Sequence, residues 1–100
     1  MNGGVVRCPD NLEMLGDYAF FDFHSLDTLT LNNGLRFIGE EAFAKCKKLT
    51  SVKIPQSVQH IGMGAFCGCH ALEKVLVPET LSYLDLRTVF PSHTEIEYYP

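Results

Sequence analysis

The chain of 100 residues, 46% of them hydrophobic and 20% charged, has the composition of one ordered domain, which we place at residues 1–100. A net charge of −4, with Lys45, Lys47 and Lys48 as the only basic cluster, argues against nucleic acid as a partner. No stretch approaches the ~20 apolar residues that span a bilayer, and the first residues do not form a secretory signal. We therefore expect a cytoplasmic protein without membrane insertion, or a cell-surface location if the chain is part of a longer exported protein.

An internal repeat organises the sequence. A shift of 23 residues aligns most apolar positions, and a period of this length is typical of stacked repeats. Four rows result, at residues 5–27, 28–50, 51–73 and 74–97. In the first three rows, separate columns hold glycine, alanine and phenylalanine, and a leucine follows six residues after each phenylalanine. The members are Gly16, Gly39 and Gly62; Ala19, Ala42 and Ala65; Phe20, Phe43 and Phe66; Leu26, Leu49 and Leu72.

Each row carries a segment of the L-x-x-L-x-L type, at residues 26–31, 49–54 and 72–77. Its alternation with a period of two predicts a strand, with Leu29 and Leu31 facing inward and Thr30 facing outward. Pro55, Pro78 or an Asn-Gly turn then ends the strand at the same place in its row. Equivalent strands of successive rows would form a parallel ladder.

The second half of each row predicts one or two short helical turns. In residues 38–46, acidic residues lie near the start and a lysine near the end, which suits a helix dipole. The glycine column permits a sharp turn, the alanine column permits close approach of a neighbouring row, and the phenylalanine fills the interior. The rows together predict an α/β solenoid, in which each flat coil buries its apolar side against the next coil.

Two surfaces are candidates for binding a protein partner. The first consists of outward strand positions, whose mixture of charge and hydroxyl groups also fits an ordinary solvated surface; it includes Thr30, Lys53, Lys74 and Leu76. The second is a column that precedes the buried Leu or Ile of each row and holds Met14, Phe37, His60 and Tyr83. Facing solvent, this column would be a stripe of the residue types enriched at interfaces. We expect it instead to be at least partly buried.

The run Cys67-Gly68-Cys69-His70 has the chemistry of zinc ligands, but we interpret it as structural. Cys69 shares a column with Cys46 and Phe23, and a column that accepts phenylalanine belongs to the apolar interior. A structural zinc site takes four ligands, whereas only Cys67 and His70 remain. A disulfide between Cys46 and Cys69 is geometrically conceivable, with buried reduced thiols as the default. The sequence has no phosphate loop, paired acid motif or H-E-x-x-H run, so we expect no cofactor, no metal and no enzyme activity.

These columns resemble the BspA-type leucine-rich repeat family, also called the Treponema type. Its repeats read approximately L-x-x-V-x-I-P-x-S-V-x-x-I-G-x-x-A-F-x-G-C, and residues 49–69 follow that pattern closely. The resemblance covers about residues 5–84. It implies a right-handed leucine-rich-repeat solenoid with a parallel strand ladder on one face, and a role in protein binding or adhesion without shared catalytic residues.

The ends of the chain depart from the repeat. In the fourth row Asp85 replaces the glycine and one residue is inserted between Leu84 and Phe90, as expected of a terminal repeat whose outer side faces water. We therefore predict that residues 81–100 form a degenerate C-terminal capping repeat. In the first row, aromatic residues at positions 18, 21 and 23 would help to close the coil.

The sequence thus predicts a non-catalytic protein-protein interaction module that presents a solenoid surface to a macromolecular partner. Two alternatives stay open. One is a small intracellular inhibitor of an enzyme or host factor, which suits the acidic charge and the small size. The other is a structural fragment or cap of a longer surface adhesin array, and an end-to-end homo-oligomer is also left open.

Overall fold

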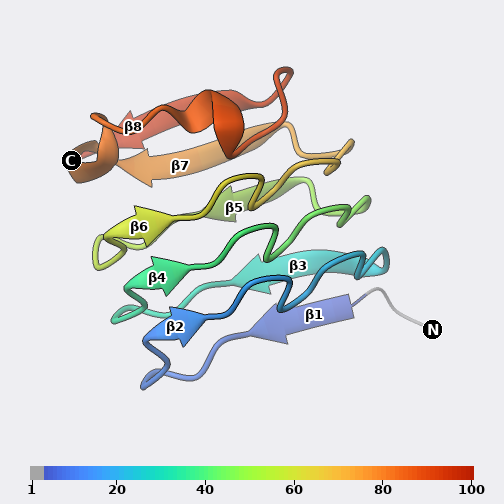
Figure 1. The fold of residues 1–100 in the computed structure, drawn as a ribbon, viewed down its shortest axis with the longest axis horizontal. Coiled ribbons are helices and arrows are strands. Elements are labelled where there is room, and N and C mark those ends of the chain that lie inside the picture. The colour runs from blue at the N-terminus through green and yellow to red at the C-terminus, as the bar shows by residue number, and fades with distance from the viewer. Residues whose placement is uncertain (1–3) are drawn as a thin grey trace.

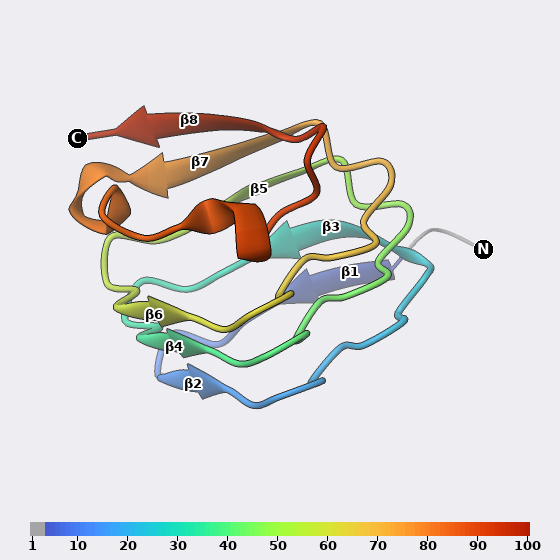
Figure 2. The same cartoon turned by 45° about the horizontal axis from the view of Figure 1, so that its top comes forward.

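The 23-residue period becomes a stack of coils in the structure, a computed structural model that describes residues 4–100 (Figure 1). Each of the first three coils passes through one strand, turns, passes through a second and shorter strand, and returns through further turns. Figure 2 shows that the two sets of strands lie on opposite sides of the stack. One side holds β1 (Gly4–Arg7), β3 (Leu26–Thr30), β5 (Ser51–Lys53), β7 (Lys74–Pro78) and β8 (Glu95–Tyr99), and the other holds β2 (Met14–Leu15), β4 (Phe37–Ile38) and β6 (His60–Ile61).

The strands have the predicted alternation of buried and exposed side chains. In β3, Leu26 and Leu29 are buried while Thr28 and Thr30 are exposed, and in β5 only Val52 is buried. All strand pairs are parallel, as predicted. The ladder is divided into three sheets, β1–β3, β2–β4–β6 and β5–β7–β8, so that β3 and β5 do not pair.

The predicted helical turns appear in the first three rows only as isolated turns, without a helix. The reason is that backbone N–H groups alternate between two kinds of partner. The N–H groups of Ala42 and Ala44 donate within their own coil, whereas the N–H of Phe43 donates to Ala65 of the next coil at 2.8 Å. Half of the donors that a helix would use are therefore committed to stacking, and an α-helix cannot form.

Two positions in each of these coils adopt the left-handed backbone conformation that also prevents a helix. They fall in columns of the repeat, and in the third coil both positions are glycine, which adopts a positive φ at no steric cost. The first column is Tyr18, Glu41 and Gly64, and the second is Asp22, Lys45 and Gly68.

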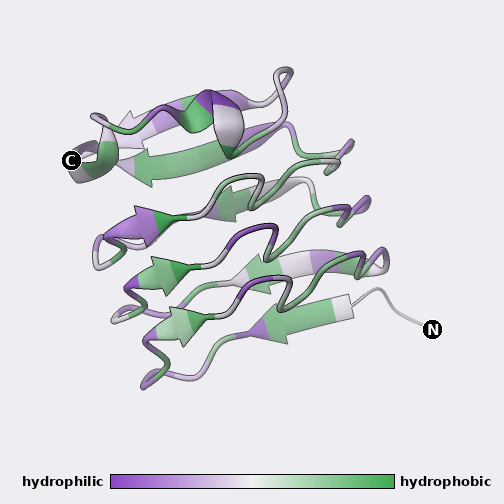
Figure 3. Ribbon diagram, viewed as in Figure 1, coloured by the Kyte–Doolittle hydropathy of each residue, from purple (hydrophilic) through white to green (hydrophobic). Residues whose placement is uncertain are grey.

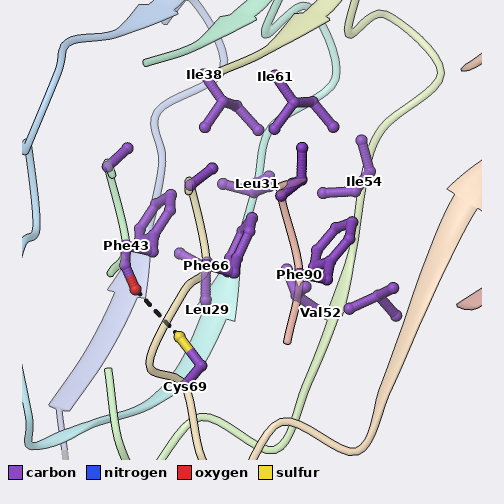
Figure 4. Packing of buried hydrophobic residues seen from close by; sticks show 14 of the residues in the cluster. Leu29, Leu31, Ile38, Phe43, Val52, Ile54, Ile61, Phe66, Cys69 and Phe90 are labelled. Atoms are coloured by element: carbon purple, nitrogen blue, oxygen red, sulfur yellow. Dashed lines mark hydrogen bonds between the residues drawn. The ribbon is translucent and has the colours of Figure 1, made fainter. Parts of the chain in front are cut away.

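A stack of phenylalanine rings forms the centre of the core. The ring centroids of Phe20 and Phe43 are 5.3 Å apart, those of Phe43 and Phe66 5.2 Å, and those of Phe66 and Phe90 5.1 Å. Figure 4 shows the last three of these rings in line beneath the isoleucines of β4 and β6. The predicted alignment of phenylalanines in one continuous interior is confirmed, and the inserted residue in the fourth row does not displace Phe90.

The fourth row differs from the other three as its degenerate sequence predicts. Two 3-10 helices, η1 (Glu79–Leu81) and η2 (Leu86–Thr88), replace its second strand. Asp85, which stands in the glycine column, caps η2 by accepting a hydrogen bond from the Arg87 N–H at 3.1 Å. This row covers the third coil, where Phe66, Cys69 and Leu72 are fully buried. Within residues 4–100, no helix has the length and apolar character needed to cross a membrane.

Candidate protein-interaction surfaces

The column of Met14, Phe37 and His60 lies on the short strands β2, β4 and β6. Backbone pairing places Phe37 beside both Met14 and His60. The following residue of each strand points inward and is buried, so its neighbour must point outward. The column therefore points outward, and the expectation of burial is wrong for Met14, which is 61% exposed, whereas Phe37 is 37% exposed and partly covered. Figure 3 shows apolar residues in β2 and β4, whereas β6 begins with a hydrophilic residue.

Tyr83 continues the column in sequence but lies outside the strand ladder. It occupies the turn between η1 and η2, and no backbone pairing joins it to His60. At 73% exposure it is the most exposed large hydrophobic residue in the described chain. The fourth coil therefore presents its aromatic side chain without the rigid pairing that holds the other three.

Neighbouring side chains restrict the motion of Phe37. The guanidinium carbon of Arg36 lies 5.8 Å from the centre of the Phe37 ring, and Arg36 also donates a hydrogen bond to Gln59 of the next coil at 3.4 Å. Strand pairing thus fixes the backbone of Phe37, and a guanidinium group lies over its ring. Such a preorganised aromatic residue loses little entropy when a partner covers it.

The second predicted surface lies on the opposite side of the coils, so the two do not form a single site (Figure 2). Register places Thr30 beside Arg7, and Lys53 beside Leu76. Leu76 is only partly exposed, and Lys74 forms an ion pair with Glu97 at 2.7 Å. The hydrogen bond and charge of Glu97 raise the pKa of Lys74, so this ammonium group already has a partner within the chain.

Lys53 is differently placed from Lys74. Its ammonium nitrogen lies 4.9 Å from the centre of the Tyr99 ring, and it forms no ion pair with a residue in the described part of the chain. The Tyr99 hydroxyl donates a hydrogen bond to the Ile54 carbonyl at 2.7 Å, and burial raises the pKa of that hydroxyl. Pro78 follows the ladder partner of Ile54 and has no N–H, so the tyrosine supplies the donor that the ladder lacks there.

A groove of about 800 Å³ crosses this side of the solenoid next to Lys53. Its lining includes three residues that the repeat predicts to face outward, Arg7, Thr30 and Lys53. It also includes Gln56 and Tyr99, which were absent from the predicted binding residues. Tyr99 lies beyond the recognisable repeats, and its contact with Lys53 depends on the fold of the fourth row.

Three of the four cysteines belong to the interior. Cys46 and Cys69 are fully buried on adjacent coils, which confirms their assignment to an apolar column. The Cys69 thiol donates to the Phe43 carbonyl at 3.1 Å (Figure 4), and its hydrogen bond with Cys46 together with burial raises its pKa. Cys8 is also buried, while Cys67 is exposed. Among residues 4–100, no group of three or more His, Cys, Asp or Glu side chains is arranged to hold a metal.

Comparison with known proteins agrees with this architecture. The family model described as "BspA type Leucine rich repeat region (6 copies)" matches residues 5–98. A leucine-rich repeat protein of T. pallidum superposes with a TM-score of 0.72 and 29% identity over 90% of this chain and 43% of that chain. One from Bacteroides ovatus ATCC 8483 superposes with a TM-score of 0.57 and 27% identity, over 87% of this chain and 28% of that chain.

This chain therefore spans less than half the length of either solved relative. A search of curated proteins finds no match. The match of the family model over nearly the whole chain, with the solved structures that share its coils, confirms the resemblance drawn from the repeat columns. The chain belongs to the BspA-type leucine-rich repeat family.

Proposed function

We propose that this chain is a non-catalytic protein-interaction module. Its principal docking surface consists of the outward side chains of the β2–β4–β6 ladder, together with Tyr83 in the next coil. The observation that carries this proposal is the exposure of Met14 and Phe37 on paired strands whose inner residues are buried. Methionine and aromatic side chains are enriched at protein interfaces, and a rigid strand presents them at low entropic cost. The expected partner is a folded protein with an apolar patch of its own.

The first test uses purified chain immobilised and exposed to native cell extract, with captured proteins identified and the strongest one then purified. Titration calorimetry of that partner would compare the wild-type chain with Phe37→Ala and Tyr83→Ala. We expect each substitution to weaken binding by about 2 kcal/mol if the residue is an anchor of the interface.

A matched control is Tyr98→Ala, since Tyr98 is also an exposed tyrosine but lies on β8, away from the β2–β4–β6 ladder. Wild-type affinity for this variant, together with weakened binding of the two column variants, would support the assignment. Unchanged binding by Phe37→Ala and Tyr83→Ala would exclude the column as the docking surface.

A second candidate function, end-to-end assembly, is favoured by the first coil. Core positions that are fully buried in the middle coils are only partly buried there, as at Leu12, Phe20 and Phe23, and Val5 on β1 is 64% exposed. The outer edge of β1 has no strand beside it among the described residues. Such an edge and apolar end suit a second coil, here from another copy of the chain.

Light scattering over a range of protein concentrations tests this assembly. We expect a dimer in the wild type and a monomer for Val5→Lys, because a lysine at an edge strand opposes strand pairing. The control Val5→Thr keeps the branched shape and should still assemble. A wild-type chain that stays monomeric at high concentration would contradict the second candidate and leave the first unaffected.

A further inference from the structure

The strand side of the solenoid opens between the second and third coils. Among the described residues no backbone hydrogen bond joins β3 to β5, although β1 pairs with β3 and β5 pairs with β7. In the next coil the Ile54 N–H donates to the Leu76 carbonyl at 2.8 Å. The equivalent bond one coil earlier would run from the Leu31 N–H to the Lys53 carbonyl, and it is missing.

The opposite side of the same two coils is closed. There the Gly62 N–H donates to the Ile38 carbonyl at 2.7 Å, and the Phe43 N–H donates to the Ala65 carbonyl at 2.8 Å. The two coils are thus hydrogen-bonded along β4 and β6 but not along β3 and β5. Cα atoms of β3 and β5 still lie within 8 Å of one another, so a ligand can lie over the unpaired backbone groups but has no room to enter between the strands.

The groove described above lies over this opening. Leu29 and Leu31 contribute its apolar floor, and a second hollow of about 420 Å³ extends it over Leu29, Ser51 and Leu76. An extended chain laid along these hollows would meet apolar side chains below and unpaired backbone groups beside it.

The charge of the groove favours an acidic ligand. Arg7 and Lys53 lie on its two sides, both are exposed, and neither forms an ion pair with a described residue. Asp10 is the one carboxylate among the residues that line the larger hollow. Glu97 in the lining of the smaller hollow is paired with Lys74, so among the described residues two cations without an ion-pair partner outnumber the one unpaired carboxylate here, on a chain whose net charge is −4.

We propose that this groove binds an extended, acidic peptide segment of a partner protein. Carboxylates of the segment pair with Arg7 and Lys53, and its chain lies extended along the groove over Leu29 and Leu31. This inference rests on the proposed protein-binding function. It adds a second binding surface and specifies an acidic peptide as the ligand of that surface. It is independent of Phe37 and Tyr83, which lie on other elements.

The test measures fluorescence polarisation of a short fluorescein-labelled peptide of alternating Glu and Thr, with a peptide of alternating Gln and Thr as its neutral match. We expect the acidic peptide to bind the full chain and the neutral peptide to bind about tenfold more weakly. Raising the salt concentration should weaken the binding, because partly exposed ion pairs are screened. Backbone amide NMR shifts should change at Leu31 and Lys53 and stay constant at Phe37.

The decisive variant is the double charge reversal Arg7→Glu with Lys53→Glu, which should abolish peptide binding. Its matched control, Lys47→Glu with Lys48→Glu, makes the same change in net charge at exposed residues that do not line the groove. Circular dichroism of both variants verifies that they are folded, and Arg7→Gln with Lys53→Gln provides a milder second pair.

Equal peptide affinity in the groove and control variants would overturn the proposal, as would shift changes confined to other residues. Binding of heparin or an oligonucleotide in preference to the acidic peptide would also overturn it, because the ligand would then be a polyanion of another class. If the peptide fails to bind while Phe37→Ala still weakens partner binding, the further site is excluded and the proposed function stands.

Discussion

Gly39 and Gly16 occupy the same column of the repeat, but the structure predicts opposite responses to alanine. A Cβ atom added at Gly39 would lie 2.5 Å from the Asp17 backbone nitrogen and 2.6 Å from the Gly16 carbonyl carbon. A Cβ atom added at Gly16 would meet nothing within 4 Å, because Gly16 belongs to the first coil. Gly39→Ala should therefore destabilise the protein, whereas Gly16→Ala should not.

The size of the effect follows from the hydrogen bonds that hold these two coils together. To restore ordinary van der Waals contact of about 3.4 Å, the first coil must move by about 0.9 Å. The Gly39 N–H bond to Leu15 is 2.8 Å long, and the Tyr18 N–H bond to Glu40 is 2.9 Å long. A shift of that size takes both beyond hydrogen-bonding range, at a net cost of about 1 kcal/mol each.

The bond from the Glu40 N–H to the Asp17 carboxylate, at 2.8 Å, would be stretched as well. We thus expect Gly39→Ala to lower the free energy of unfolding by about 2–3 kcal/mol, which corresponds to roughly 10–20 °C in Tm for a domain of this size. Gly16→Ala should raise the free energy of unfolding by about 0.4–1 kcal/mol, since alanine reduces the freedom of the unfolded chain.

Urea denaturation followed by circular dichroism, with thermal unfolding as a second measurement, compares the two variants with the wild type. The glycine removed and the alanine added are the same, so the unfolded-state contribution cancels in the comparison. Equal free energies of unfolding for the two variants would refute the reasoning that close approach of neighbouring coils requires this glycine.

Three further predictions concern the core and its thiol and phenol groups. Phe43→Ala should lower the free energy of unfolding by about 3–5 kcal/mol, because it empties the middle of the ring stack. Phe21→Ala, at an exposed position, should change the free energy of unfolding by less than about 1 kcal/mol. Comparable losses for the two variants would argue against the stack as the centre of the core. In absorbance titration Tyr99 should ionise above the ordinary tyrosine range, because burial raises its pKa. Its stabilising contribution is present below about pH 10 and is lost as the pH rises through the raised pKa. Tyr99→Phe should remove this titration step, and a Tyr99 that ionises together with the other tyrosines would contradict the prediction. A thiol reagent should label the exposed Cys67 alone in the folded protein and all four cysteines in denaturant. Labelling of Cys67 should be slowed at neutral pH, because partial desolvation and the charge of Glu41 raise its pKa. Rapid native labelling of Cys46 or Cys69 would show that the coils open readily.

Much of the fold was predictable because the same positions are apolar in successive rows of the repeat. Phe43 and Phe66 share a column, and a column that is apolar in successive coils has to face the space between them. The inward direction of Leu29 and Val52 follows from the period of two in a strand, and the interior position of Cys69 follows from its column mates. For these residues, the sequence pattern is sufficient to predict whether the side chain is buried.

The sequence by itself determined the period, the register and the interior of this solenoid, but only the tertiary structure decided what the surfaces are. Met14 was expected, with its column, to be at least partly buried, and it is 61% exposed because the neighbouring Leu15 fills the inner position. The chain between Gly39 and Cys46 has the charge pattern of a helix, yet stacking takes every second N–H for the next coil. No feature of the repeat predicts that β3 and β5 fail to pair. The residues of these two strands align like those of the paired strands, and hydrogen bonding between them depends on the exact position of each backbone.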